Sequence, residues 1–254
     1  MLIRSVIFVC LFNVLTVIQL LFWTPVFFFM SRENCWKVVR CWAWLSLHVH
    51  HWLIGTRFEF RGTENIPDGG YIMAAKHQST WETYTMVLFL RDPSYILKRE
   101  LMFLPFFGWF AMKADVISVN RGKKSEALKA MTRKAREHCE SGRQIVIYPE
   151  GTRTHAYAPP SYKYGITHMY SSINVRVLPI ALNSGLFWPR KGWRLYKGTI
   201  IVEFLPVIEP GLSGDQFSKH MQDMIEDTSN ALMAEAQADP EFDGPAPPPV
   251  TDYL

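Results

Sequence analysis

The segment that decides the fold is YIMAAKHQSTWE, residues 71–82. Its first half, Tyr71–Lys76, is apolar except for its last residue, which is typical of a buried β-strand. Mostly polar residues follow directly, from His77 to Glu82. In folds that alternate strands and helices, ligands usually bind at the carboxyl ends of the strands. The segment therefore predicts a strand and, immediately after it, a candidate functional site.

Similar short apolar runs recur along the chain. They are rich in Ile and Val and bounded by Gly, Pro, Asn or Asp, as strands are. The runs are Ser94–Leu97, Val116–Val119, Gln144–Tyr148, Val177–Leu182 and Thr199–Phe204. Ser125 is a plausible N-cap for a helix that ends at Gly142, and Ser213 with Gln216 forms a capping-box pattern that opens a last helix to about Ala238. This alternation predicts an α/β fold with a mixed or mostly parallel central sheet flanked by helices.

The composition excludes two classes of protein. Of the 254 residues, 48% are hydrophobic and 20% are charged. The charged fraction is too high for a polytopic membrane protein, and the hydrophobic fraction is too high for a wholly disordered chain. Residues 1–61 carry six basic and two acidic side chains, and residues 62–212 carry twenty basic and twelve acidic ones. Residues 213–254 carry one basic and nine acidic side chains. The four cysteines show no CxxC spacing, which argues against a zinc site or a disulfide framework.

The N-terminal region predicts a membrane anchor. No charge occurs between Ser5 and Met30, and about 20 apolar residues are enough to span a bilayer. The run lacks a cleavage-site pattern, so we interpret it as retained. From Asn34 to Gly55 a basic stripe lies opposite an apolar face rich in tryptophan, which favours a helix at the membrane interface over an ordinary core helix.

The chain is therefore predicted to have three parts. Residues 1–56 form membrane-anchoring helices, either one span plus an interfacial helix or a hairpin entering one leaflet. Residues 57–238 form the α/β domain, and residues 239–254 form a Pro-rich tail that we expect to be disordered. Basic residues after the first helix favour a domain on the cytoplasmic side of the inner membrane. His48, His50 and His51 do not predict a metal site, because on a helix His50 points away from the other two.

His77 and Glu82 are the first candidate pair of functional residues. A neutral imidazole is suited to accept a proton at neutral pH, and a carboxylate bonded to its Nδ1 fixes its tautomer and stabilises its charged form. A turn between a strand and a helix could bring Glu82 back onto His77. A His-x4-acid pattern is common, however, and a capping or surface histidine is the alternative reading of this motif alone.

Two further loops follow predicted strands. In Glu150-Gly151-Thr152-Arg153, the glycine lets the backbone approach a ligand, and the arginine can bind a phosphate through two parallel hydrogen bonds. Residues 120–124 form a cationic loop ahead of a helix N-terminus, which suits an anion, with a solvated basic turn as the alternative. The G-x-S-x-G, H-E-x-x-H and P-loop motifs are absent, so the usual support for a serine hydrolase, a zinc protease or a P-loop nucleoside triphosphatase is missing.

Together and in this order, the blocks resemble the 1-acylglycerol-3-phosphate acyltransferase family, the lysophospholipid acyltransferases. His77–Glu82 matches the first family block, His-x4-Asp, with the one departure that Glu82 stands in the place of the aspartate. Val116–Arg121 resembles the second block, which ends in a substrate-phosphate arginine. Glu150–Arg153 matches the third, and Val177–Leu182 looks like the fourth. The resemblance covers residues 58–206.

The resemblance implies an O-acyltransferase that moves a fatty acyl group from acyl-CoA or acyl-carrier protein to the sn-2 hydroxyl of lysophosphatidic acid, giving phosphatidic acid for phospholipid synthesis. It assigns proton removal to His77 and its support to Glu82. The substrate-binding residues that it implies are Arg121, Glu150, Gly151, Thr152 and Arg153. The arginines would bind the phosphate, Gly151 and Thr152 would shape that pocket, and Glu150 would orient an arginine or contact a substrate hydroxyl.

The implied partners are the membrane bilayer, lysophosphatidic acid and the acyl donor, with no nucleic acid, metal or tightly bound cofactor. The excess of basic residues in the middle region suits these anionic substrates. Two alternatives remain open from the sequence. The acceptor could be another lysolipid, including an amino-acid lipid, or the chain could be a non-catalytic membrane-binding protein on the same scaffold.

Overall fold

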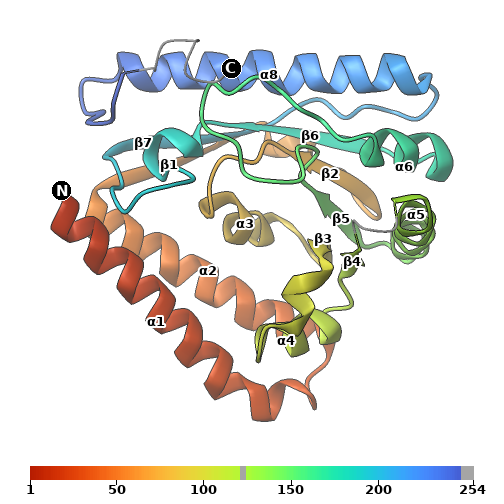
Figure 1. The fold of residues 1–254 in the computed structure, drawn as a ribbon, viewed down its shortest axis with the longest axis horizontal. Coiled ribbons are helices and arrows are strands. Elements are labelled where there is room, and N and C mark those ends of the chain that lie inside the picture. The colour runs from red at the N-terminus through yellow and green to blue at the C-terminus, as the bar shows by residue number, and fades with distance from the viewer. Residues whose placement is uncertain (121–123, 247–254) are drawn as a thin grey trace.

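The structure is a computed structural model that describes residues 1–120 and 124–246. Within these residues, helices cover both faces of a seven-stranded sheet (Figure 1). The strands are β1 (Thr56–Arg61), β2 (Tyr71–Ala75), β3 (Pro93–Lys98), β4 (Ile117–Val119), β5 (Gln144–Ile147), β6 (Val177–Leu182) and β7 (Gly198–Phe204). The α-helices are α1 (Leu2–Phe27), α2 (Arg32–Ile54), α3 (Trp81–Thr85), α4 (Phe107–Lys113), α5 (Lys124–Glu140), α6 (Gly165–Ile173), α7 (Ser184–Phe187) and α8 (Gly214–Ala238). Three short 3-10 helices are η1 (Thr63–Asn65), η2 (Met86–Phe89) and η3 (Arg99–Phe103).

The strand order is β1-β7-β6-β2-β5-β3-β4. Neighbouring strands run parallel except β6 and β7, which are antiparallel. This confirms the predicted α/β class with a mostly parallel sheet. The central position of β2 places the residues that follow it, including His77, between the ends of β5 and β6.

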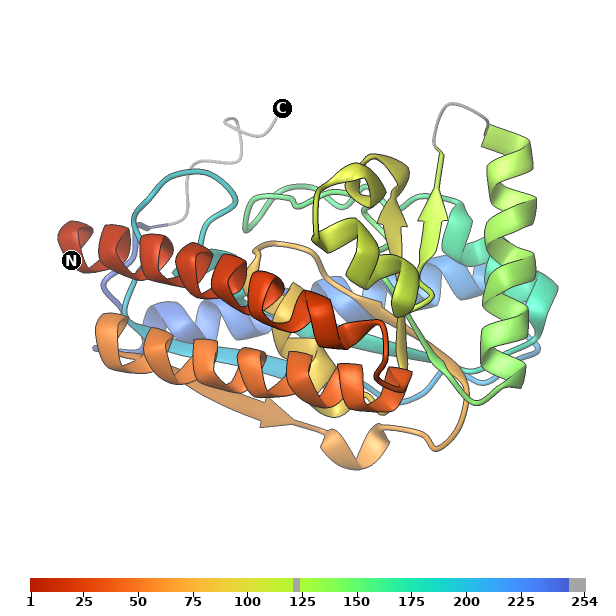
Figure 2. The same ribbon diagram turned by 90° about the horizontal axis from the view of Figure 1, so that it is seen from below.

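The burial of β2 explains why the central strands are continuous apolar runs. Every residue from Tyr71 to Ala75 is buried. Met73 and Ala75 pack in the cluster that includes residues of α1, α2 and α3, whereas Ile72 and Ala74 pack with α5, α6 and α8. Because strand side chains alternate between faces and both faces are covered, every position must be apolar (Figures 1 and 2).

Some elements differ from the sequence-based expectation. The structure adds β1 as an edge strand, in which exposed Arg57 and Glu59 alternate with half-buried Phe58 and Phe60. α5 begins at Lys124, so Ser125 lies in its first turn rather than at its N-cap. The predicted capping box that opens α8 is confirmed.

α1 and α2 lie side by side along one face of the molecule (Figure 2). One side of α1 packs on the body along its length: Phe8 and Phe12 contact Trp188 near its start, and Phe27 stacks closely with Phe110 at its end. Its other side is apolar and exposed. Among the described residues, α1 is the one helix long and apolar enough to cross a membrane.

The packed side of α2 differs from the predicted division into two stripes. Ala43, Leu47 and His50 are buried, and they lie between the basic stripe and the apolar stripe. The exposed side therefore combines members of both, such as Lys37 and Trp52. A mixed surface of basic and tryptophan side chains is still typical of a helix at a membrane interface.

Part of the predicted disordered tail is ordered. Arg57 forms ion pairs with Asp239 and Glu241, and the ring of Phe242 packs against Phe187. These contacts bind the residues directly after α8 to the end of the sheet that holds β1 and β7. Residues 247–254 of the predicted tail lie outside the described residues.

Candidate active site

His77 and Glu82 are brought together by the turn between β2 and α3. His77 lies just beyond the carboxyl end of β2, and Glu82 lies in the first turn of α3. Nδ1 of His77 is 2.9 Å from Oε1 of Glu82. A carboxylate in this position fixes the tautomer in which Nδ1 carries the proton, so Nε2 is the atom that can accept one.

The carboxylate of Glu82 is itself held by several donors. Its side chain is fully buried. Oε1 also accepts the backbone N–H groups of Gln78 (2.8 Å) and Ser79 (2.7 Å), and Oε2 accepts the hydroxyl of Ser184 (2.8 Å). An unpaired buried carboxylate is strongly unfavourable, so these bonds allow Glu82 to remain buried behind His77.

The loop after β5 is bonded to the backbone of His77. Oε2 of Glu150 accepts the N–H of His77 at 2.8 Å, and the N–H of Thr154 donates to the carbonyl of His77 at 2.8 Å. Gly151 has a φ of 69°, which glycine adopts without strain, and it turns the loop toward His77. Glu150 is 1% exposed, and its carboxylate holds the backbone of His77. The role that the resemblance implies for it, orienting an arginine or contacting a substrate hydroxyl, stays a prediction.

A buried cation completes this support. Lys76 Nζ lies 2.9 Å from Oε1 of Glu150 and 2.6 Å from Oε1 of Glu226, which belongs to α8. The hydroxyl of Tyr162 donates to Glu226 at 2.9 Å. This network of Lys76, Glu150 and Glu226 links the last helix to the residue beside His77. It lacks a local sequence signal, because its members are far apart in the chain.

His77 faces a cavity of about 1020 Å³ that is lined mainly by apolar side chains of α1, α2, β3, α4 and α5. Trp36, Trp42 and Tyr95 are examples. The ring of Tyr148 also lines it and stacks on the imidazole of His77 at 4.1 Å between ring centres. A large cavity lined mainly by apolar side chains, with a histidine in its lining, suits a ligand with a hydrocarbon chain and one reactive polar end.

The polar end of the cavity is cationic. Gly151, Thr152 and Arg153 are among its lining residues, and Nη1 of Arg153 donates to the hydroxyl of Thr80 at 2.6 Å. Their predicted role in binding a phosphate stays a prediction. The lining also includes Lys98, the last residue of β3, and Lys163, neither of which was among the predicted site residues. Arg121 lies outside the described residues. Its role in binding substrate therefore stays a prediction. Val119, at the end of β4 and two residues before it in the sequence, lines the cavity.

Other reactive groups lie away from this arrangement. His50 is fully buried, and burial lowers its pKa to about 3. Burial raises the pKa of Cys139 to about 12, which opposes the thiolate form that a nucleophile needs. Among the described residues, no group of three or more His, Cys, Asp or Glu side chains is placed to hold a metal ion. The expected absence of a metal or cofactor stays a prediction.

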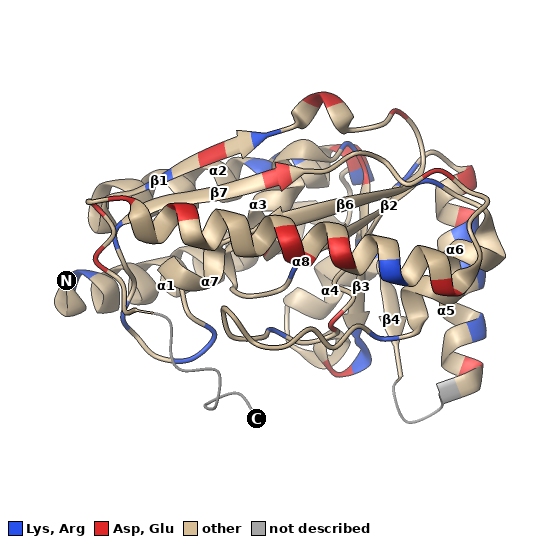
Figure 3. Ribbon diagram, turned by 90° about the horizontal axis from the view of Figure 1, so that it is seen from above, with Lys and Arg blue, Asp and Glu red and all other residues tan. Residues whose placement is uncertain are grey.

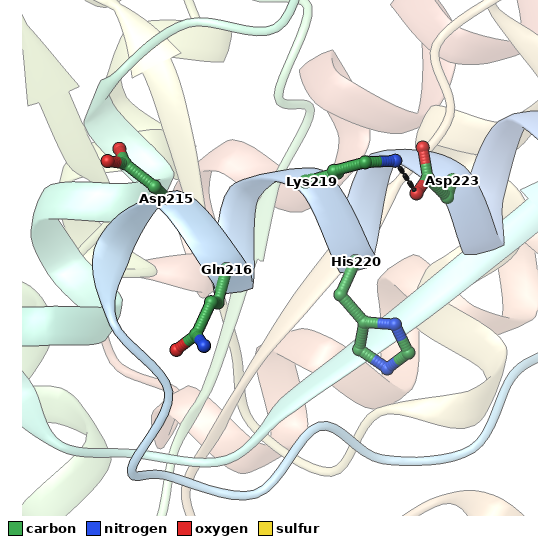
Figure 4. A pocket seen from close by; sticks show the side chains of 5 residues that line it. All are labelled: Asp215, Gln216, Lys219, His220 and Asp223. Carbon is green, nitrogen blue, oxygen red and sulfur yellow. Dashed lines mark hydrogen bonds and ion pairs between the residues drawn. The ribbon is translucent and has the colours of Figure 1, made fainter.

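A second, shallow hollow lies on the outer side of α8 (Figure 4). Asp215, Lys219, His220 and Asp223 border it, and Lys219 pairs with Asp223 four residues along the helix. None of the predicted site residues lies there. Exposed i,i+4 pairs of this kind are ordinary features of a solvated helix.

Comparisons with known proteins show the family of the chain. The sequence model of the Acyltransferase family matches residues 57–183. The 1-acyl-sn-glycerol-3-phosphate acyltransferase of Pseudomonas aeruginosa is 34% identical over 214 residues, which are 84% of this chain and 82% of that protein. The human 1-acyl-sn-glycerol-3-phosphate acyltransferase alpha is 30% identical over 67% of this chain and 62% of its own length.

The fold is also found in a solved structure. The crystal structure of the 1-acyl-sn-glycerophosphate acyltransferase PlsC from Thermotoga maritima superposes with a TM-score of 0.76 and 20% identity, covering 91% of this chain and 97% of that one. At this identity the likeness concerns the fold alone.

Proposed function

The chain belongs to the Acyltransferase family and is an O-acyltransferase, and from that premise we propose that it acylates the sn-2 hydroxyl of lysophosphatidic acid at a membrane surface. The observation that carries this proposal is the His77–Glu82 pair at the cationic end of a long apolar cavity. The names of the similar proteins from Pseudomonas aeruginosa and human support the same acceptor.

The mechanism follows from the atoms that the site presents. Nε2 of His77 takes the proton of the acceptor hydroxyl while its oxygen attacks the thioester carbonyl of acyl-CoA or acyl-carrier protein. Glu82 stabilises the imidazolium that forms. The tetrahedral intermediate then expels the thiolate, which recovers the proton from His77. No covalent acyl-enzyme and no metal is required.

The cationic end of the cavity would bind the phosphate. Arg153 offers a planar pair of donors that matches a phosphate, and Lys98 and Lys163 add charge around it. In this assignment Arg121 is a further phosphate ligand, carried by the family resemblance. The apolar part of the cavity would take an acyl chain, and the phosphate would fix the distance between that chain and His77.

We also propose that the enzyme is monotopic, with its catalytic domain on the cytoplasmic side. α1 packs on the body along one side and exposes apolar residues on the other, which suits a helix that lies in one leaflet beside the domain. α8, which carries several acidic residues, forms the layer on the opposite side of the molecule from α1 and α2 (Figures 1 and 3). The basic residues Arg32, Lys37 and Arg40 after α1 favour a cytoplasmic domain.

The deciding experiment is an acyl-transfer assay with a panel of lysolipids and both donor types. We expect His77→Ala and Glu82→Ala to lose about 10²–10⁴-fold in kcat, the usual contribution of a positioned proton acceptor, while Glu82→Asp retains activity. Full activity of His77→Ala would overturn the mechanism. Product formed only from another lysolipid, such as an amino-acid lipid, would overturn the acceptor assignment while leaving the chemistry in place.

A further inference from the structure

The segment between β3 and β4 carries exposed apolar side chains that the acyl-transfer site does not use. η3 and α4 lie beside the C-terminal end of α1 (Figure 2). We call their outer side chains the η3–α4 patch: Phe103 (72% exposed), Leu104 (49%), Trp109 (42%) and Met112 (57%). None of the four lines the cavity. Adjacent exposed apolar residues of this size mark a surface that contacts another phase or molecule.

The patch is displayed by a rigid unit. Phe106 is the centre of a γ-turn with φ 62° and ψ −56°, closed by the N–H of Phe107 on the carbonyl of Pro105 at 2.6 Å. A Cβ on Gly108 would lie 2.0 Å from the carbonyl oxygen of Met102, so glycine is what lets α4 fold back on η3. A strained turn and a close backbone contact fix the outward direction of these side chains, which a mobile loop would not do.

The patch continues the apolar surface of α1. The ring of Phe28, just past α1, lies 6.4 Å from the ring of Trp109, and Nζ of Lys113 donates to the carbonyl of Phe28 at 3.1 Å. On the inner side of the same unit, Phe107 and Phe110 line the cavity. α4 therefore has one apolar side toward the cavity and one toward the outside, next to the helix that we propose to be in the membrane.

The charges around the patch are those of a membrane-interface segment. Lys98, Arg99 and the single carboxylate Glu100 are exposed at its edge, and the guanidinium of Arg99 lies 6.0 Å from the centre of the Phe103 ring. Long basic side chains place their stems on apolar surface and their charges among anionic headgroups. The four patch side chains themselves are uncharged and include two aromatic rings, as in elements that insert at the interface.

We propose that the η3–α4 patch inserts into the same bilayer leaflet as α1 and forms a second anchor beside it. This inference rests on the proposed membrane-bound function. An acidic carrier protein is the other partner that an apolar patch with a basic edge could bind. The continuity with the uncharged surface of α1 favours the bilayer.

The test measures how deeply the patch side chains lie in the bilayer, with the full chain. Nitroxide labels are attached at Phe103→Cys, Met112→Cys and, as a control, Leu212→Cys, an exposed apolar position (39%) just before α8. The exposed Cys10 and Cys41 are first replaced by serine. The proteins are reconstituted in vesicles of phosphatidylethanolamine and phosphatidylglycerol, and collisions with oxygen and with a water-soluble nickel complex are compared.

We expect the labels at positions 103 and 112 to collide more often with oxygen than with the nickel complex, and the label at 212 to collide more often with the nickel complex. Labels at 103 and 112 that behave like the control would overturn the proposal. So would labels that become shielded only when acyl-carrier protein is added, which would assign the patch to that partner. The measurement needs no catalysis, so a failure of the proposed function in the acyl-transfer assay is scored separately.

A second experiment asks whether the anchor matters for turnover. Phe103→Gln/Met112→Gln is compared with Leu212→Gln on long-chain lysolipid in vesicles and on a short-chain, monomeric lysolipid. We expect about a tenfold loss for the double variant on vesicles only, equivalent to about 1.4 kcal/mol of lost membrane attachment. Equal losses on both substrates would contradict the proposal, because they would indicate a damaged active site instead of a lost anchor.

Discussion

Replacing Lys76 by methionine tests whether the buried network beneath His77 supports catalysis. The Lys76 side chain is 3% exposed, and its ammonium contacts carboxylates of Glu150 and Glu226 at 2.9 and 2.6 Å. Methionine fills most of the same volume without the charge, so it leaves two carboxylates with no cation between them. Removing one partner of a buried ion pair costs about 3–5 kcal/mol, a large part of a total stability of about 5–15 kcal/mol.

The same change should lower the rate of acyl transfer. Oε1 of Glu150 pairs with Lys76 and accepts the hydroxyl of Thr154, and its Oε2 accepts the N–H of His77. If repulsion from Glu226 displaces the Glu150 carboxylate, the backbone of His77 is displaced with it. A misplacement of about 1 Å can cost about 10²-fold in rate. We therefore expect kcat to fall about 10- to 100-fold, with a smaller change in the KM of the acyl donor.

The assay is denaturant unfolding of the detergent-solubilised protein, followed by tryptophan fluorescence, together with steady-state kinetics. Lys219→Met is the matched control, because Lys219 pairs with Asp223 on the exposed side of α8 and should change stability by less than about 0.5 kcal/mol. Lys76→Met/Glu226→Gln should regain part of the lost stability, since the carboxylate repulsion is removed. A Lys76→Met enzyme with wild-type stability and kcat would refute this account of the network.

Three further predictions concern single residues. Burial lowers the pKa of His50 to about 3, so below about pH 6.5 the unfolded chain binds a proton at this residue that the folded chain does not. Acidification to pH 5 should therefore destabilise the protein by about 2 kcal/mol through His50. His50→Leu should remove that part of the pH dependence of the unfolding free energy, and an unchanged pH dependence would contradict the prediction. Glu82→Asp should reduce kcat about tenfold yet exceed Glu82→Ala, because a shorter carboxylate loses some of its four donors; equal rates of the two variants would count against the pair. Arg153→Lys should raise the KM of a phosphate-bearing acceptor about tenfold with little effect on the KM of the donor, measured by varying each substrate in turn, and a donor-only effect would reassign the arginine.

The sequence was sufficient for the central strands and for the pairing of His77 with Glu82. Both depend on local information: apolar runs that must be buried on two faces, and a turn short enough to return the carboxylate to the imidazole. β1 was missed because the strands were sought as continuous apolar runs, whereas its charged residues alternate with phenylalanine, the pattern of an edge strand with one exposed face.

The parts of the site that the sequence could not predict come from contacts between distant segments. Ser184 donates to Glu82 across 102 positions, and Lys76 reaches Glu226 across 150. Neither residue type is unusual where it occurs, and one serine or lysine among many carries no pattern. For Glu150 the family resemblance implied contact with an arginine or a substrate hydroxyl, which stays a prediction. The bond from its buried carboxylate to the backbone of His77 depends on the fold and has no signal in the motif.

The replacement of the family's aspartate by Glu82 is explained by what surrounds the carboxylate. Oε1 lies where the N–H groups of Gln78 and Ser79 converge with Nδ1 of His77, and Oε2 reaches Ser184 at the start of α7. A side chain one methylene longer can satisfy all four donors only if α7 stands far enough from the turn to leave room for it. Ser184 should therefore matter more here than in a chain with aspartate. Ser184→Ala should lower kcat in the wild type and have little further effect in Glu82→Asp, and equal losses in both backgrounds would show that the serine does not set the length of this side chain.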